Sequence, residues 1–213
     1  MQGKIFAVGL TGGIGSGKTE VGKIFETIGA KLIKADLIAR ELIDSNKSIR
    51  SQIEKTFGKD IYLSSSKLDR QKVGKLIFAN RNLQEQLNRI VHPHVINQID
   101  AEIKLLKKSK KYPLIVVEAA LIYEAGTEDA YDYIIVVDAS EESRIKRLIA
   151  RDNASRDEIM NRFKAQLPQE MKIEKADFVI QNDCDLKSLQ EKCSFIFGLL
   201  KQLSMLQNEP EVS

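Results

Sequence analysis

The segment Gly12–Thr19, which reads GGIGSGKT, constrains the fold of this chain more than any other part of the sequence. It directly follows the apolar run Ile5–Leu10, and five of the chain's 12 glycines fall between Gly9 and Gly17. Glycine can adopt backbone conformations that other residues avoid, and it lets a ligand approach the main chain closely. The sequence therefore predicts a buried strand, a tight loop that binds a ligand through its backbone, and a helix that begins where the glycines end.

The eight residues match the pattern G-x-x-x-x-G-K-[ST], with Gly12 and Gly17 as the fixed glycines. In such a loop the backbone N–H groups and the N-terminal end of the next helix bind a polyphosphate. The lysine neutralises the β- and γ-phosphates, and the hydroxyl group of the last residue binds Mg²⁺. We expect a purine nucleoside triphosphate, with Mg²⁺ as the cofactor, bound through Gly13, Ile14, Gly15, Ser16, Gly17, Lys18 and Thr19. A glycine-rich turn that binds nothing would not require the Lys-Thr pair.

The composition of the 213-residue chain is that of an ordinary globular protein, with 43% hydrophobic and 30% charged residues. A net charge of +3 is too small to indicate a nucleic-acid partner. No stretch reaches the roughly 18 apolar residues that a membrane span needs. Cys184 and Cys193 form a poor disulfide framework, so we expect a reducing compartment, the cytoplasm. No obligate protein partner is evident.

Five short runs rich in Ile, Val and Phe predict five strands. Several are apolar without alternation, which is typical of parallel strands covered on both faces by helices. We therefore expect an α/β fold, a P-loop NTPase core with a five-stranded parallel sheet and helices on both faces. The predicted strands are Ile5–Leu10, Lys31–Ala35, Leu114–Ala119, Tyr133–Val137 and Phe178–Ile180.

Two long segments between these strands show helical periodicity. The first separates the second and third strands and predicts a helical insertion, and the second, rich in arginine, predicts a helical lid. The expected parts are a nucleotide-binding core (1–36, 112–143 and 176–206), a helical acceptor-binding region (37–111), a lid (144–175) and a disordered tail (207–213). The lysine run between Lys104 and Lys111 is interpreted as a solvated helix end.

A P-loop occurs in kinases, GTPase switches and ATP-driven machines. A guanine-specific switch would carry Asn-Lys-x-Asp, but the only Asn-Lys pair, at Asn46, lacks the aspartate. Asp36 directly follows the second predicted strand, at the end where ligands gather in open α/β sheets. A carboxylate there can orient an alcohol and accept its proton. Asp36 is therefore a candidate base for phosphoryl transfer, although a helix N-cap is an alternative role.

Phosphoryl transfer also needs positive groups that stabilise charge on the transferred phosphoryl group, and arginines of the lid segment could supply them. Arg147 and Arg151 are four residues apart, so they share one face of a helix and could converge on the triphosphate. Each could equally be a surface charge. Arg147 is the stronger candidate because of its place between the last two strands.

In addition, the chain resembles the dephospho-CoA kinases from Ile5 to about Leu189. The P-loop alone is unspecific, but its combination with Ala-Asp-x-Ile-Ala-Arg and a downstream His-Pro is selective. The matching pieces are Leu10–Thr19, Ala35–Arg40, Leu68–Arg70, His92–Pro93, Val136–Asp138, Arg147, Arg151–Asp152, Gln166 and the stretch from Ala176 to Asn182.

This resemblance implies transfer of the ATP γ-phosphate to the ribose 3′-hydroxyl of dephospho-CoA, which gives coenzyme A. It implies that Asp36 is the catalytic base, Lys18 the phosphate ligand and Arg147 the lid arginine. Asn182 would border the adenine. The acceptor-binding residues would be Asp36, Arg40 and His92, although His92–Pro93 could instead be a helix stop before proline.

The sequence departs from the family pattern at two places. Lys34 stands where family members often have aspartate, and Glu118–Glu124 reads EAALIYE where the family usually has Asp-x-Pro-Leu-Leu-Phe-Glu. Glu118 keeps a carboxylate, but the charge near Mg²⁺ and the shape of the acceptor pocket are affected. Another P-loop kinase acting on a nucleoside or nucleotide, and a non-catalytic nucleotide-binding regulatory module, are therefore alternative functions.

Overall fold

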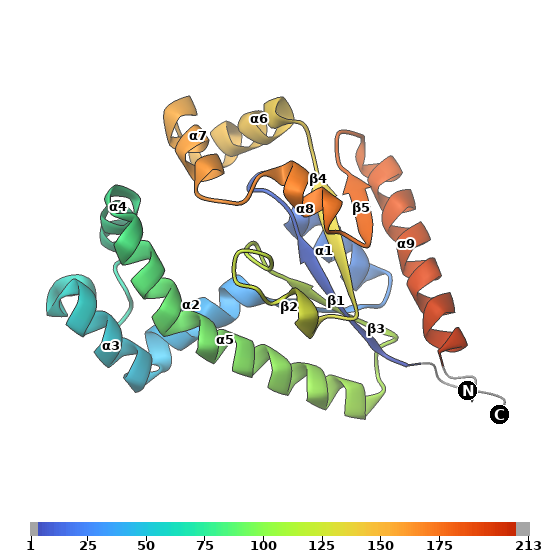
Figure 1. Ribbon diagram of the computed structural model, residues 1–213, viewed down its shortest axis with the longest axis horizontal. Helices are drawn as coiled ribbons and strands as arrows, with labels where there is room; N and C mark the ends of the chain where they lie inside the picture. Colours follow the sequence, from blue (N-terminus) through green and yellow to red (C-terminus); the bar gives the residue numbers. More distant parts are fainter. Residues whose placement is uncertain (1–3, 208–213) are drawn as a thin grey trace. The chain divides into compact units, whose positions relative to one another are not determined.

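The five expected strands form one parallel sheet in the computed structural model, which describes residues 4–207 apart from the side chains of Phe78, Ala79 and Arg81. Each predicted strand differs from the observed one by no more than one residue at either end. The order across the sheet is β2-β3-β1-β4-β5 (Figure 1). The strands are β1 (Phe6–Thr11), β2 (Lys31–Lys34), β3 (Leu114–Glu118), β4 (Tyr133–Asp138) and β5 (Phe178–Gln181).

The register brings the carboxyl ends of three strands to one edge of the sheet. Leu10 near the end of β1 pairs with Glu118, and Glu118 at the end of β3 pairs with Lys34 at the end of β2. The loop Gly12–Thr19 leaves the sheet at this edge. Every residue of β1 is buried, as expected for a central strand covered on both faces.

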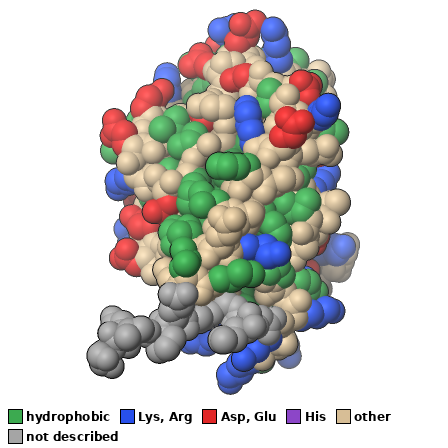
Figure 2. Space-filling view, turned by 90° about the vertical axis from the view of Figure 1, so that its right-hand side faces the viewer, with side chains coloured by type: hydrophobic (Ala, Val, Ile, Leu, Met, Phe, Trp, Pro, Cys, Tyr) green, Lys and Arg blue, Asp and Glu red, His purple; other side chains and the backbone are tan. Residues whose placement is uncertain are grey.

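One face of the sheet is covered by α1 (Lys18–Thr27) and α9 (Leu186–Leu206). In α9 the buried residues recur every three to four positions, so that one stripe of the helix faces the core. They are Leu189, Cys193, Ile196, Leu200 and Ser204. The outward side of α9 also carries apolar side chains, among them the exposed Phe195 and Met205, and Figure 2 shows hydrophobic side chains gathered on this side of the molecule.

The opposite face is covered by the connection between β3 and β4, which includes η2 (Glu128–Ala130), and by α8 (Gln169–Glu174). Ile122 and Tyr123 of this connection pack with Ile134 and Val136 of β4, and Ile173 of α8 joins the cluster. Helices therefore lie on both faces of the sheet, as predicted.

Two further helices, α6 (Glu141–Asp152) and α7 (Arg156–Lys164), lie within the arginine-rich segment. The hydroxyl oxygen of Ser140 caps α6, and Ser155 with Glu158 forms a capping box at the start of α7. Ile14 of the glycine-rich loop packs against the apolar cluster that these helices share. These amino-terminal caps explain why α6 and α7 form as separate helices in a segment that was expected to be one polar helical stretch.

Residues Ala35–Glu102 form a second compact unit. It contains α2 (Ala35–Ser45), α3 (Lys47–Phe57), η1 (Lys59–Ile61), α4 (Arg70–Ala79) and most of α5 (Arg81–Ser109). Asp44 accepts a hydrogen bond from the N–H of Leu68 at 3.0 Å and forms an ion pair with Arg70 at 2.7 Å. Asp69 caps α4. The Leu68–Arg70 motif thus stabilises this helical unit.

The interpretation of His92–Pro93 as a helix stop is wrong, because α5 runs through Pro93. Proline lacks the N–H that would bond to the preceding turn, but the helix continues on both sides. His92 is half-buried, and burial lowers its pKa. Burial therefore favours the neutral form of its imidazole.

Helix α9 is the last element of the described part of the chain. Gln207 is the C-cap residue of α9, and the rest of the expected tail, 208–213, lies outside the described residues. None of the helices between residues 4 and 207 combines the length and apolar character needed to cross a lipid bilayer. Lys107 of the lysine run forms an ion pair with Asp132 at 3.2 Å.

Candidate active site

The loop between β1 and α1 has the backbone conformation that its glycines allow. Gly12, Gly15 and Gly17 have φ angles of 148°, 82° and 95°, which other residues rarely adopt. A Cβ atom at Gly12 would overlap the carbonyl oxygen of Val137, and one at Gly17 would overlap the side-chain amide of Asn182. Glycine is thus required here both by backbone conformation and by the close approach of other segments.

Lys18, the first residue of α1, folds back over this loop. Its Nζ atom donates hydrogen bonds to the carbonyl oxygens of Gly12 at 2.8 Å and Gly13 at 3.1 Å. The oxygen of Gly13 also accepts a bond from the N–H of Ser16 at 3.1 Å. The ammonium group is therefore fixed at the loop, where a terminal phosphate would be neutralised.

Thr19 meets a carboxylate at the end of β3. Its hydroxyl group donates to Oε1 of Glu118 at 2.5 Å, while Oε2 of Glu118 is buried and has no hydrogen-bond partner among the described residues. A hydroxyl and a carboxylate oxygen are ligands that Mg²⁺ accepts, usually together with phosphates and water. The donor set fits this ion, although residues 4–207 contain no cluster of three or more His, Cys, Asp or Glu side chains that could hold a metal by themselves.

Arg147 and Asn182, both predicted site residues, meet at the same loop. Arg147 Nη1 lies 3.2 Å from the carbonyl oxygen of Ser16, and its Nη2 lies 2.5 Å from that of Asn182. The side-chain amide of Asn182 donates to the oxygen of Ser16 at 2.7 Å. Arg151 makes a different contact, because it pairs with Asp152 at 2.8 Å. The two arginines therefore do not converge on the loop.

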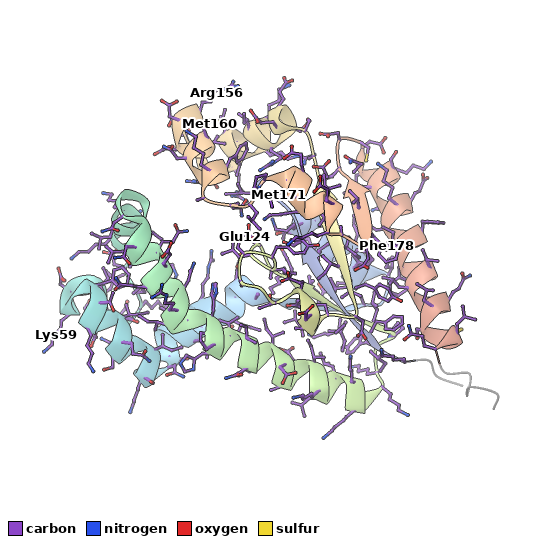
Figure 3. All side chains as sticks on the ribbon, viewed as in Figure 1. Lys59, Glu124, Arg156, Met160, Met171 and Phe178 are labelled. Carbon is purple, nitrogen blue, oxygen red and sulfur yellow. The ribbon has the colours of Figure 1, made fainter. Side chains whose placement is uncertain are left out.

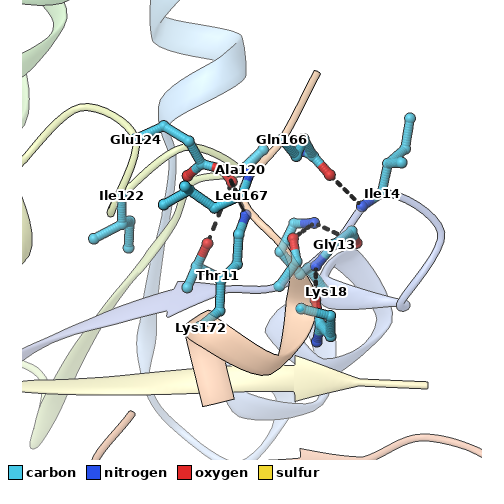
Figure 4. A network of polar contacts seen from close by, with 12 residues as sticks. Thr11, Gly13, Ile14, Lys18, Ala120, Ile122, Glu124, Gln166, Leu167 and Lys172 are labelled. Atoms are coloured by element: carbon cyan, nitrogen blue, oxygen red, sulfur yellow. Dashed lines mark hydrogen bonds and ion pairs between the residues drawn. The ribbon is translucent and has the colours of Figure 1, made fainter. Parts of the chain in front are cut away.

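Two glutamines near α8 also bind the loop. The N–H of Gly13 donates to Oε1 of Gln169 at 2.7 Å, and the N–H of Ile14 donates to Oε1 of Gln166 at 2.8 Å (Figure 4). Sequence reasoning gave Gln166 no role and did not find Gln169. The available signal for these contacts was Gly13. The pattern G-x-x-x-x-G-K-[ST] does not require glycine at this position, so a glycine there indicates that another segment approaches the loop closely. A Cβ atom there would lie 2.5 Å from Nη2 of Arg144 and 2.9 Å from Oε1 of Gln169.

Arg144 was also missed as a contact of the loop. Its Nε donates to the carbonyl oxygen of Ile14 at 3.0 Å, and its guanidinium group lies 4.0 Å from the centre of the Phe163 ring. Burial lowers its pKa, although the group stays charged. Arg144 therefore connects α6, α7 and the loop.

An ion pair between a fully buried lysine and a mostly buried glutamate holds the segment that carries the glutamines. Lys172 of α8 lies 2.7 Å from Glu124, which follows β3, and Glu124 also accepts a bond from the N–H of Leu167 at 3.0 Å. Figures 3 and 4 show Glu124 on this connection, next to α8. Both residues were outside the predicted site.

Three predicted residues, Asp36, Arg40 and His92, belong to the helical unit Ala35–Glu102. Helix α2 begins at Ala35, so Asp36 lies in its first turn and does not precede the helix as an N-cap would. Asp36 and Arg40 are exposed. Their roles stay predictions.

The family model for dephospho-CoA kinase matches residues 6–188, which is most of the chain. The chain belongs to the dephospho-CoA kinase family. A dephospho-CoA kinase of Carboxydothermus hydrogenoformans is 40% identical over 185 residues, which cover 87% of this chain and 89% of that protein. The prediction that the chain is a kinase is thereby confirmed, and so is the prediction that it belongs to a family of coenzyme A biosynthesis.

Solved structures agree with this family membership. A dephospho-CoA kinase from Campylobacter jejuni has a TM-score of 0.69 and 27% identity, covering 93% of this chain and 98% of that one. The protein TT1252 from Thermus thermophilus has a TM-score of 0.77 and 28% identity, covering 92% and 98%. The fold of this chain is therefore that of a P-loop kinase.

Proposed function

We propose that this kinase transfers the γ-phosphoryl group of ATP to the ribose 3′-hydroxyl of dephospho-CoA and so produces coenzyme A. The observation that carries the proposal is the loop Gly12–Thr19, in which the ammonium group of Lys18 lies 2.8 Å from the oxygen of Gly12. This loop supplies the chemistry for a nucleoside triphosphate, and the family identifies the acceptor.

In the proposed reaction the 3′-oxygen forms a bond to the γ-phosphorus while the bond to the β,γ-bridging oxygen breaks, and ADP leaves. Little covalent work is left to the protein, so positioning and charge stabilisation dominate. Lys18 stabilises negative charge on the phosphates. Arg147 and Asn182, which both contact the carbonyl oxygen of Ser16, are the proposed residues that border the nucleotide.

Thr19 and Glu118 are the proposed protein ligands for Mg²⁺. Their oxygen atoms lie 2.5 Å apart, and the second carboxylate oxygen of Glu118 has no other partner among the described residues. When bound, the ion neutralises charge on the β- and γ-phosphates. This proposal also explains why a carboxylate is kept at position 118 although the surrounding motif differs from the family.

Asp36 is the proposed base that accepts the proton of the 3′-hydroxyl group. Its support is its position two residues after the end of β2, whose carboxyl end shares an edge of the sheet with the loop. Arg40 lies four residues later in α2 and so shares a helix face with Asp36. We propose Arg40 and His92 as ligands of the acceptor.

We further propose that the segment 144–175 includes a lid and that the enzyme is cytoplasmic. Phosphoryl transfer needs water to be excluded, since an open site would hydrolyse ATP. Two crystal structures, with and without a nucleotide analogue, test the lid, and an identical α6–α7 pair in both would contradict it. Both cysteines are free thiols, as expected in a reducing compartment.

A coupled ADP-release assay with ATP, Mg²⁺ and dephospho-CoA tests the reaction. We expect turnover with dephospho-CoA and at most background rates with adenosine or AMP as acceptor. Asp36→Asn should lose turnover but keep nucleotide affinity, whereas Glu41→Gln, an exposed carboxylate on the same helix, should be unchanged. Turnover with AMP alone would identify a nucleotide kinase, and ATP binding without any acceptor-dependent ADP release would identify a regulatory module.

A further inference from the structure

The two glutamines hold the same peptide groups that bind the catalytic lysine. The N–H of Gly13 and the carbonyl of Gly12 belong to one peptide group, which Gln169 contacts at the N–H and Lys18 at the oxygen. The next peptide group joins the carbonyl of Gly13 to the N–H of Ile14. Gln166 contacts its N–H, and Lys18 again contacts its oxygen.

A peptide group is planar, so its N–H and C=O point in fixed opposite directions. A side chain that fixes the direction of the N–H therefore also fixes the direction of the oxygen. In glycine-rich backbone this restraint matters, because glycine leaves many orientations of the peptide group accessible. Figure 4 shows these bonds around Gly13, Ile14 and Lys18.

Gln169 is built to hold its position. It is buried, it accepts from Gly13 at 2.7 Å, and it donates through Nε2 to the carbonyl oxygen of Val137 at 3.0 Å. The side chain thus connects the end of β4 to the loop, and both ends of its amide group are bonded. The contact leaves no room for a Cβ atom at Gly13.

The backbone around Gln166 and Gln169 is fixed in turn. Glu124 accepts a bond from the N–H of Leu167 and pairs with Lys172, whose side chain is fully buried. Lys172 lies one turn after Gln169 in α8. The backbone that carries both glutamines is therefore attached through Glu124 to the connection that follows β3.

We propose that Gln166 and Gln169 are positioning residues for phosphoryl transfer, which act through Lys18 by fixing the two peptide groups whose oxygens hold its ammonium group. The resulting arrangement keeps the lysine directed at the terminal phosphates before the nucleotide binds. This inference rests on the proposed function, but it concerns the nucleotide side of the site and not the acceptor.

The experiment is a double-mutant cycle on nucleotide binding, measured by calorimetry with ATP and Mg²⁺ in the absence of dephospho-CoA. Gln169→Met keeps the side-chain length but loses both hydrogen bonds, and we expect about tenfold weaker ATP binding. In a Lys18→Ala background the same substitution should change the affinity less than about twofold, because the glutamine acts through the lysine. Gln190→Met, the same substitution at an exposed position of α9, is the control and should have no effect.

Hydrogen exchange of the Gly13 and Ile14 amides gives a second measurement, since loss of their acceptors should speed their exchange. Gln166→Met, at a half-buried position, provides an independent variant if Gln169→Met fails to fold. Unchanged ATP affinity and unchanged amide exchange in a folded variant would overturn the inference. An equal loss of ATP affinity on Gln169→Met in the unmutated protein and in the Lys18→Ala protein would overturn it as well. The proposed function would fail differently, namely by the absence of ADP release from the unmutated protein with dephospho-CoA.

Discussion

The Nζ atom of Lys172 lies 2.7 Å from Oε1 of Glu124, and no part of the Lys172 side chain reaches solvent. Breaking a buried ion pair leaves the remaining charge without compensation. Lys172→Met should therefore lower the free energy of unfolding by about 3–5 kcal/mol, measured by denaturant titration. The double variant Lys172→Met/Glu124→Gln should recover part of this loss, whereas Lys164→Met, on the exposed side of α7, should change little. A Lys172→Met variant as stable as the unmutated protein would contradict a buried charged pair.

Lys18 is expected to serve catalysis and not folding. Lys18→Ala should lower kcat by at least about 100-fold, the size of effect seen when one group that stabilises transition-state charge is removed. Its melting temperature should stay within a few degrees of the unmutated value, roughly the shift for 1 kcal/mol in a chain of this length. Lys23→Ala, on the exposed side of the same helix, is the control. Retained turnover in Lys18→Ala would exclude its proposed role.

Two glycines should respond to alanine in opposite directions. Gly12 has a φ angle of 148°, and a Cβ atom there would overlap the backbone oxygen of Val137, so Gly12→Ala should cost at least about 2 kcal/mol. Gly198 lies in α9 with nothing within 4 Å of an added Cβ atom. Gly198→Ala should therefore stabilise the protein by about 0.5–1 kcal/mol through helix propensity. Equal effects of the two substitutions in chemical denaturation would contradict this contrast.

Asp152 should make stability depend on pH in the acid range. Its hydrogen bond with Arg151, together with Arg162, lowers the pKa of the Asp152 carboxyl group to about 2. Since the pKa is lower in the folded than in the unfolded state, the stabilisation is present above about pH 4 and is lost as the pH falls towards 2. The pair is partly exposed, so its contribution should stay below about 1 kcal/mol.

The comparison of the unmutated protein with Asp152→Asn measures this contribution. Their difference in free energy of unfolding should be constant between about pH 5 and 7 and should shrink steadily as the pH falls from about 4 through the folded-state pKa of Asp152, near 2. Asp157→Asn, a carboxylate in the first turn of α7, is the comparison variant, because the pair with Arg151 and Arg162 does not involve it. A difference between Asp152→Asn and the unmutated protein that is as large at pH 2 as at pH 7 would show that the charge of Asp152 is not its cause.

The strands and the loop could be predicted from the sequence because their signals are local. Continuous apolar runs such as Leu114–Val117 indicate strands covered on both faces, and the observed strands agree within one residue at either end. The positive φ angles of Gly12, Gly15 and Gly17 are also local requirements. The helical character of the insertion followed from its periodicity, although the continuation of α5 through Pro93 did not.

The contacts of the loop with distant segments could not be predicted in the same way. Gln169 is 156 residues from Gly13, and nothing in the sequence around Gln169 distinguishes it from a surface glutamine. Lys172 lies in a polar, charged stretch that predicts solvent exposure, yet its side chain is fully buried. In each case the partner is supplied by another layer of the fold.

The sequence by itself determined the phosphate-binding loop, the parallel sheet and the family, because each depends on residue types at short, fixed spacings. Only the tertiary structure decided which side chains fix the two peptide groups that bind Lys18 and which carboxylate meets Thr19. Hydrogen bonds require distances near 3 Å, and such distances between remote residues arise only when the packed layers bring them together.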